Sequence, residues 1–178
     1  MEFETKVQFL TQPEPNRRTI VISDIHGHRA WLEKLLKKVN FSEKDILIIV
    51  GDMIEKGPES LNTIRYIMEL CEKYTVYPMM GNVDLWRIQM LLTEDGSLDQ
   101  ELYETNERMR QSWKATFFQD LCLEAGVSAK TPEEISAARE AVVAHFQREL
   151  TFMKELPSIL VAPAFTFVHG GLVHEKLE

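Results

Sequence analysis

Four short polar segments each follow an apolar run in this chain, and this arrangement limits the folds that it can adopt. In order, the segments are Asp24-Ile25-His26-Gly27, Gly51-Asp52, Gly81-Asn82 and His169-Gly170-Gly171. One such segment alone is weak evidence, because short polar motifs are common in solvent-exposed turns. Four of them, each at the end of a predicted strand, indicate polar side chains that gather at one edge of a sheet.

Alternating strands and helices in the first half of the chain predict a parallel sheet. Apolar, β-branched runs predict strands over residues 18–23, 45–50 and 75–79. Helical spacing predicts two intervening helices, the second opened by Pro58, which bury Trp31, Leu32, Leu35, Leu36, Val39, Leu61, Ile64, Ile67, Met68 and Cys71. This order of elements is typical of βαβ units with right-handed crossovers, so we expect an α/β fold.

The stretch between Asn82 and His169 is acidic and has helical periodicity. Helical segments are expected near residues 86–93, 102–124 and 131–156. We interpret residues 86–156 as a helical cap inserted into a single domain that spans residues 1–178.

Two local patterns within this cap carry specific predictions. Thr131-Pro132-Glu133-Glu134 predicts the start of the last helix, with a Thr N-cap, Pro at the first position and Glu134 closing a capping box. An apolar stripe at helical spacing comprises Trp113, Phe117, Phe118 and Leu121. Such a stripe favours core packing, and a lid over the strand-end site is the alternative.

Composition favours a cytoplasmic globular protein and excludes several functional classes. The chain is 44% hydrophobic and 27% charged, and it contains no apolar run near the roughly 20 residues that a membrane span needs. Cys71 and Cys122 are expected to be reduced core residues, because they do not have metal-ligand spacing. A net charge of -8 argues against nucleic-acid binding, and the basic cluster of Lys34, Lys37 and Lys38 is expected to face water.

A dinucleotide- or ATP-binding domain is disfavoured by the first predicted strand. Neither Gly-x-Gly-x-x-Gly nor a Walker A motif follows it.

The series of motifs resembles the calcineurin-like metallophosphoesterases, in the branch of Ser/Thr protein phosphatases and diadenosine-tetraphosphatase-type enzymes. The blocks of that branch read Asp-x-His-Gly, Gly-Asp-x-x-(Asp)-(Arg)-Gly, Gly-Asn-His-(Glu/Asp) and His-(Ala/Gly)-Gly. The match extends from Thr19 to Leu172 and includes Phe152-Met153-x-x-Leu156-Pro157 before the last block. The resemblance implies an α/β sandwich with a helical cap.

The resemblance also implies a site for two divalent metal ions. By analogy, Asp52 bridges both ions, Asp24 and His26 hold the first, and Asn82 and His169 hold the second. A hydroxide held between the ions then attacks phosphorus in line with the leaving oxygen. Mn, Fe, Zn, Mg, Co and Ni are all compatible with such ligands.

Position 83 departs from the family pattern. Relatives commonly have a His there that protonates or stabilises the leaving oxygen, whereas this chain has Val83. His28 is a candidate substitute for this histidine, but a purely structural position for His28, at a helix start or on the surface, is an equal alternative. Asp84 is a weaker candidate.

A second departure is Glu55-Lys56, where protein-phosphatase relatives have Asp-Arg. Lys56 can neutralise a substrate phosphate as a point charge, but it lacks the bidentate geometry of Arg. Phosphoprotein specificity is therefore less expected than action on a phosphorylated small molecule or nucleotide. The candidate catalytic residues are Asp52, His28 and Lys56.

Members of the family continue past the His-Gly-Gly block into further strands and a late histidine. His174 cannot replace that histidine, because it lies too close to His169. We therefore expect an incomplete C-terminal sheet, whose open edge could support self-association.

Two functions follow from these observations. The first is metal-dependent hydrolysis of a phosphate ester. The alternative is a degenerate, non-catalytic module of the same fold that binds a metal or a phosphorylated partner.

Overall fold

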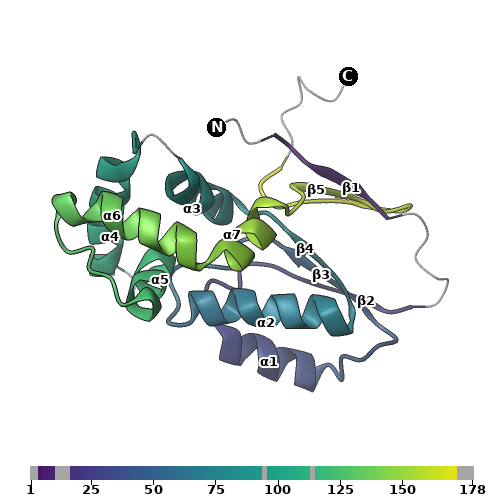
Figure 1. Ribbon diagram of the computed structural model, residues 1–178. Coiled ribbons are helices and arrows are strands. Elements are labelled where there is room, and N and C mark those ends of the chain that lie inside the picture. Colours follow the sequence, from purple (N-terminus) through teal and green to yellow (C-terminus); the bar gives the residue numbers. More distant parts are fainter. Residues whose placement is uncertain (1–3, 11–16, 94–95, 113–114, 172–178) are drawn as a thin grey trace.

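A three-stranded parallel sheet forms the centre of the computed structural model (Figure 1). Its strands are β2 (Thr19–Ile22), β3 (Ile46–Val50) and β4 (Thr75–Met79), in the order β2-β3-β4. The structure describes residues 4–10, 17–93, 96–112 and 115–171. The predicted parallel sheet and its three strands are confirmed.

A second sheet of three short strands lies against the first. It contains β1 (Val7–Phe9), β5 (Ile159–Val161) and β6 (Thr166–Val168), with β1 parallel and β6 antiparallel to β5. Strand β1 was not predicted, because its three residues give little periodicity and its partner lies near the other end of the chain. The mixed α/β fold with two sheets agrees with the α/β sandwich that the sequence predicted.

Side chains of β3 alternate between two apolar cores. Ile46 and Ile48 pack with Met79 and Leu160 between the sheets. Leu47 and Ile49 point the other way, into the larger core beneath the helices. Because β3 is buried on both faces, it fixes the position of the loop that follows it.

Helices α1 (Arg29–Lys38) and α2 (Ser60–Lys73) cover the face of the central sheet away from β1, β5 and β6 (Figure 1). Leu32 and Leu36 are buried as predicted. The prediction was wrong for Trp31 and Leu35, whose exposed fractions are 69% and 41%. Helix α1 lies outermost, so only a narrow stripe of it enters the core. Helix α2 begins two residues after Pro58.

The remaining helices form the region interpreted above as a cap: α3 (Asn82–Leu92), α4 (Asp99–Ser112), α5 (Phe117–Ala125), α6 (Pro132–His145) and α7 (Gln147–Lys154). The two longer predicted segments are each divided. Thr116 begins a new helix at α5, and Phe146 separates α6 from α7.

The capping box occurs at a different helix from the predicted one. Thr116 and Gln119 form it at α5, where the Gln119 amide donates to the Thr116 hydroxyl at 3.2 Å. Helix α6 does start after Thr131, but the Thr131 side chain makes no capping hydrogen bond. Glu134 instead accepts from the Lys130 amide at 2.8 Å and from the Ser128 hydroxyl at 2.7 Å.

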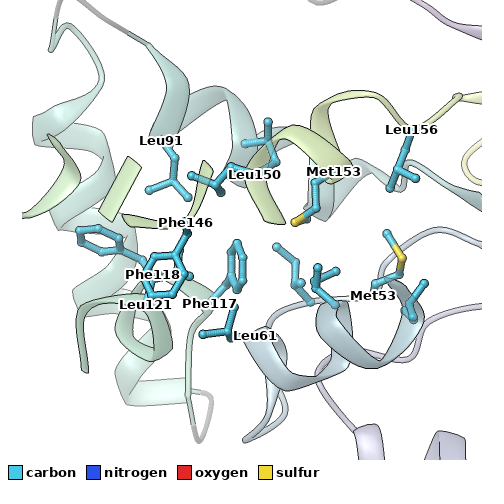
Figure 2. Close-up of a cluster of buried hydrophobic side chains, with 14 of the residues drawn as sticks. Met53, Leu61, Leu91, Phe117, Phe118, Leu121, Phe146, Leu150, Met153 and Leu156 are labelled. Atoms are coloured by element: carbon cyan, nitrogen blue, oxygen red, sulfur yellow. The ribbon is translucent and has the colours of Figure 1, made fainter. Parts of the chain in front are cut away.

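One apolar core connects the cap helices to the central sheet (Figure 2). Phe117, Phe118 and Leu121 are fully buried in it, close to Phe146 and Leu61, so the predicted core role is confirmed for these three residues. Trp113 lies outside the described residues. Cap and sheet therefore share their stabilising contacts.

The cysteines agree with the expectation from composition. Cys71 and Cys122 are free thiols, and burial raises their pKa to about 11 and about 12. No helix within the described ranges is both long and apolar enough to cross a membrane.

Truncation of Phe117 to Ala should destabilise cap and sheet together. We expect a loss of about 3–5 kcal/mol in the free energy of unfolding, because a buried aromatic side chain leaves a cavity. Leu123→Ala on the same helix is the control, since Leu123 is 84% exposed. Chemical denaturation followed by circular dichroism measures both. Two separate transitions in the wild type would contradict a shared core.

Asp120 should make stability depend on pH. This carboxylate on α5 accepts from the Leu61 amide at the start of α2, and burial raises its pKa to about 6. The fold is therefore more stable with Asp120 protonated. This stabilisation is complete below the ordinary pKa of Asp and is lost as pH rises through about 6. We expect the melting temperature of Asp120→Asn to rise relative to that of the wild type as the pH increases from 4 to 8. A pH-independent difference would contradict this assignment.

Candidate metal centre

The loops after β2, β3 and β4 converge at one edge of the central sheet. Asp24 and His26 follow β2, and Asp52 follows β3. The Asp24 amide donates to the Gly51 carbonyl at 3.2 Å, and the His26 amide donates to the Asp52 carbonyl at 2.9 Å. These two bonds extend the pairing of β2 and β3 into the loops and hold the three side chains together.

The backbone at these positions adopts a conformation that L-residues rarely use. Asp24, His26 and Asp52 have φ angles of 56°, 46° and 53°. Glu55 and Lys56, on the same loop as Asp52, have φ angles of 69° and 67°. Non-glycine residues with positive φ cost energy and cluster at functional sites, where surrounding contacts hold them. This group therefore points to a constrained site.

Glycine is required where the loops after β3 and β4 touch. A Cβ atom on Gly81 would overlap the backbone nitrogen and the Oδ1 atom of Asp52. A Cβ atom on Gly51, whose φ is 70°, would overlap the backbone of Gly81. The two glycines let the β4 loop lie directly against Asp52.

Asp52 lies at the centre of the site. Its Oδ2 atom is 3.6 Å from Nε2 of His26, and its Oδ1 atom is 3.4 Å from Nε2 of His169. His26 Nε2 is also 3.5 Å from Oδ1 of Asp24. One ligand atom from each of Asp24, His26 and Asp52 lies within 4.8 Å of the others. Asp52 thus presents one oxygen to each imidazole.

Both imidazoles are oriented by main-chain carbonyls. Nδ1 of His26 lies 3.0 Å from the Ile54 carbonyl, and Nδ1 of His169 lies 2.7 Å from the Val50 carbonyl. A carbonyl can only accept, so each Nδ1 carries the proton and donates it. With Nδ1 as the donor, Nε2 of each ring is left facing Asp52. This is the tautomer that a metal-ligating histidine uses when its other nitrogen is held by a carbonyl.

Asn82 and Val83 begin helix α3 beside Asp52. The Val83 amide donates to Asp52 Oδ1 at 3.0 Å. The side chain of Asn82 is exposed, and Asn82 lines the same cavity of about 780 Å³ as His169. Asp24, His26 and His169 therefore lie around the Asp52 carboxylate, and the residue after Asn82 donates its amide to it.

Lys56 also reaches this group. Its Nζ atom is 2.7 Å from Nε2 of His26. The Ser23 hydroxyl, which donates to Asp24 at 2.5 Å, is the main cause that holds the pKa of Asp24 below its ordinary value. The nearby charges of His169, His26 and Lys56 lower that pKa further.

His28 lies at the start of α1, outside the group of three. Its Nδ1 atom is 3.2 Å from the Ile25 carbonyl, and its ring packs against Trp31 with 4.8 Å between centroids. The catalytic role assigned to His28 stays a prediction.

Two buried groups have roles at the site that differ from anything the sequence predicted; the first is Asp84, which the sequence offered only as a weak substitute for the missing general acid. Asp84 is fully buried and accepts the amides of Met53, Ile54 and Gly81, so it ties the β3 loop to the start of α3. Burial raises the pKa of Asp84 to about 6. The spacing Gly81-Asn82-Val83-Asp84 could have indicated part of this role, since an acidic side chain at the third helical position often accepts the amide of the N-cap residue.

The second buried group is an ion pair. Nε of Arg87 donates to Oε1 of Glu55 at 2.6 Å, and both side chains have no exposed surface. No pattern in the sequence indicates this partnership, because the two residues belong to a loop and a helix that only the fold brings together.

The donor set suits divalent cations. Two carboxylates, two imidazoles whose Nε2 atoms face Asp52, and the amide of Asn82 nearby are ligand types that Mn, Fe, Zn and related ions accept. The residues present therefore fit the metal centre that the motifs predicted.

Comparison with known proteins identifies the family of this chain. A family model described as calcineurin-like phosphoesterase matches residues 17–175. The symmetrical bis(5'-nucleosyl)-tetraphosphatase of Vibrio parahaemolyticus is 41% identical over 68 residues, which cover 38% of this chain and 25% of that protein. The enzyme of the same name from Coxiella burnetii is 35% identical over 89 residues, or 49% of this chain and 28% of the relative.

A solved structure extends the comparison to the fold. The crystal structure of a proposed diadenosine tetraphosphatase superposes with a TM-score of 0.54 at 26% identity, covering 95% of this chain and 56% of that one. The chain spans about a quarter of the length of the curated relatives it matches. The extent of the family match shows that this chain belongs to the calcineurin-like phosphoesterase family.

Proposed function

We propose that this chain carries the metal-binding part of an enzyme that hydrolyses a phosphate ester or anhydride of a nucleotide with two divalent ions. The observation that carries the proposal is the position of Asp52, which directs one oxygen toward His26 and the other toward His169. A carboxylate with an imidazole on each side is suited to bridge two ions.

The other residues complete two neighbouring coordination sets. Asp24 and His26 would hold one ion, while Asn82 and His169 would hold the other. When bound, the ions would offset charge on the phosphoryl oxygens and lower the pKa of the attacking water. The ammonium of Lys56 would neutralise a non-bridging oxygen of the substrate phosphate.

Val83 favours substrates whose leaving group needs no proton. A general acid contributes roughly 10²–10⁴-fold in rate, and the valine side chain cannot supply one. A nucleoside polyphosphate leaves as a phosphate anion, whose second pKa is only about 6, so protonation matters little. This chemistry agrees with the names of the relatives, which act on bis(5'-nucleosyl) tetraphosphates. A dinucleoside polyphosphate is therefore the preferred substrate class.

Hydrolysis should require both Mn²⁺ and Asp52. We expect the chain to hydrolyse 4-nitrophenyl phosphate, its diester and a dinucleoside tetraphosphate with added Mn²⁺. Asp52→Asn should lower each rate by more than about 100-fold, since loss of even an indirect metal contact costs about 10–100-fold. Steady-state assays on metal-depleted and reloaded protein measure the effect.

His169→Gln should cause a loss similar to that of Asp52→Asn, and His145→Gln is its control, because His145 is exposed on α6. Mn²⁺ binding by a folded wild type that hydrolyses none of these substrates would favour the non-catalytic alternative.

Substitution of Val83 by His should help poor leaving groups most. We expect Val83→His to increase the rate on an alkyl phosphate ester by about 10-fold or more, within the range for a general acid, and to change the rate on a 4-nitrophenyl ester little. Rates measured over a series of esters with increasing leaving-group pKa give the slope of log rate against that pKa for the variant and the wild type. An equal change for all esters would show that proton donation does not limit the wild type.

A further inference from the structure

Lys56 contacts the nitrogen that the proposed metal site needs. Its Nζ atom lies 2.7 Å from Nε2 of His26, and this Nε2 is the same atom that faces Asp24 and Asp52. The ammonium therefore sits where two carboxylates and an imidazole converge, which is the environment that suits a cation.

Only one cation can use His26 at a time. Nδ1 of His26 donates its proton to the Ile54 carbonyl, so Nε2 has a single in-plane lone pair. Lys56 donates a proton to that lone pair, and a divalent ion would need the same lone pair. The two contacts exclude each other by geometry.

The loop that carries Lys56 is fixed from beneath. Glu55 and Lys56 both have positive φ, and the side chain of Glu55 is held by Arg87 at 2.6 Å with no exposed surface on either partner. The Glu55 amide also donates to the Ser60 hydroxyl at 3.0 Å. Such a strained turn persists only where its surroundings hold it, so the fold fixes the backbone from which Lys56 reaches His26.

We propose that Lys56 competes with the divalent ion for His26, as an internal cation that weakens metal binding at this position. This inference rests on the proposed function, since it assumes the metal site around Asp52. When the ion binds, Lys56 must leave Nε2 of His26, and its ammonium can then turn toward a substrate phosphate. The same residue would thus couple metal loading to phosphate recognition.

Removal of the Lys56 charge should tighten metal binding. We expect Lys56→Met to bind one Mn²⁺ about 10-fold more tightly than wild type, on the scale of changes near metal ligands. Isothermal titration of the metal-depleted full chain with Mn²⁺ measures this without any substrate. Circular dichroism confirms that each variant is folded.

Two controls make the comparison specific. Lys73→Met removes the same charge from the exposed last turn of α2 and should leave Mn²⁺ affinity unchanged. In a His26→Gln background, which has already lost this proposed ligand, Lys56→Met should leave the remaining Mn²⁺ affinity unchanged, because the competition acts through His26.

The outcomes separate this inference from the proposed function. Equal or weaker Mn²⁺ binding by Lys56→Met, with wild-type binding still lost in Asp52→Asn, overturns the competition alone. A gain of the same size in Lys73→Met overturns it too, since a general charge effect would suffice. Absence of Mn²⁺ binding in every protein overturns both proposals.

Discussion

The carboxylate of Asp52 is the point on which the arrangement of the site depends. It accepts the Val83 amide, faces His26 with one oxygen and His169 with the other, and is nearly buried. Its backbone carbonyl accepts from His26 as well. Loops from three strands and the last polar motif therefore meet at one residue. This convergence requires Gly81, because any side chain there would overlap Asp52.

Packing keeps that convergence rigid. Strand β3 is buried on both faces, so the loop carrying Asp52 starts from a fixed position. Asp84 then bonds to three backbone amides, which joins this loop to the start of α3. The core around Phe117 and Phe146 extends the same support to the cap helices. Site geometry and global stability consequently rest on the same contacts.

In the proposed site, the balance of charges would link metal binding to substrate binding. Asp24 and Asp52 bring negative charge to one edge of the sheet, and Lys56 offsets part of it through its contact with His26. The buried pair of Glu55 and Arg87 holds the loop that makes this contact. An ammonium at this position would lower metal affinity and would also be near the phosphate that the metals bind.

The sequence by itself determined the parallel sheet, most helices and the series of candidate ligands. These features are local: β-branched runs, helical spacing and motifs at strand ends are visible in short windows. Family membership followed for the same reason, because its motifs are short and ordered.

Only the tertiary structure decided which partners meet. Strand β1 needs a partner from the far end of the chain, and Trp31 is exposed because α1 is the outermost helix. The pairing of Glu55 with Arg87 and the contact of Lys56 with His26 join distant segments, so no local pattern encodes them. Periodicity tells which face of a helix is apolar, but packing determines how much of that face is covered.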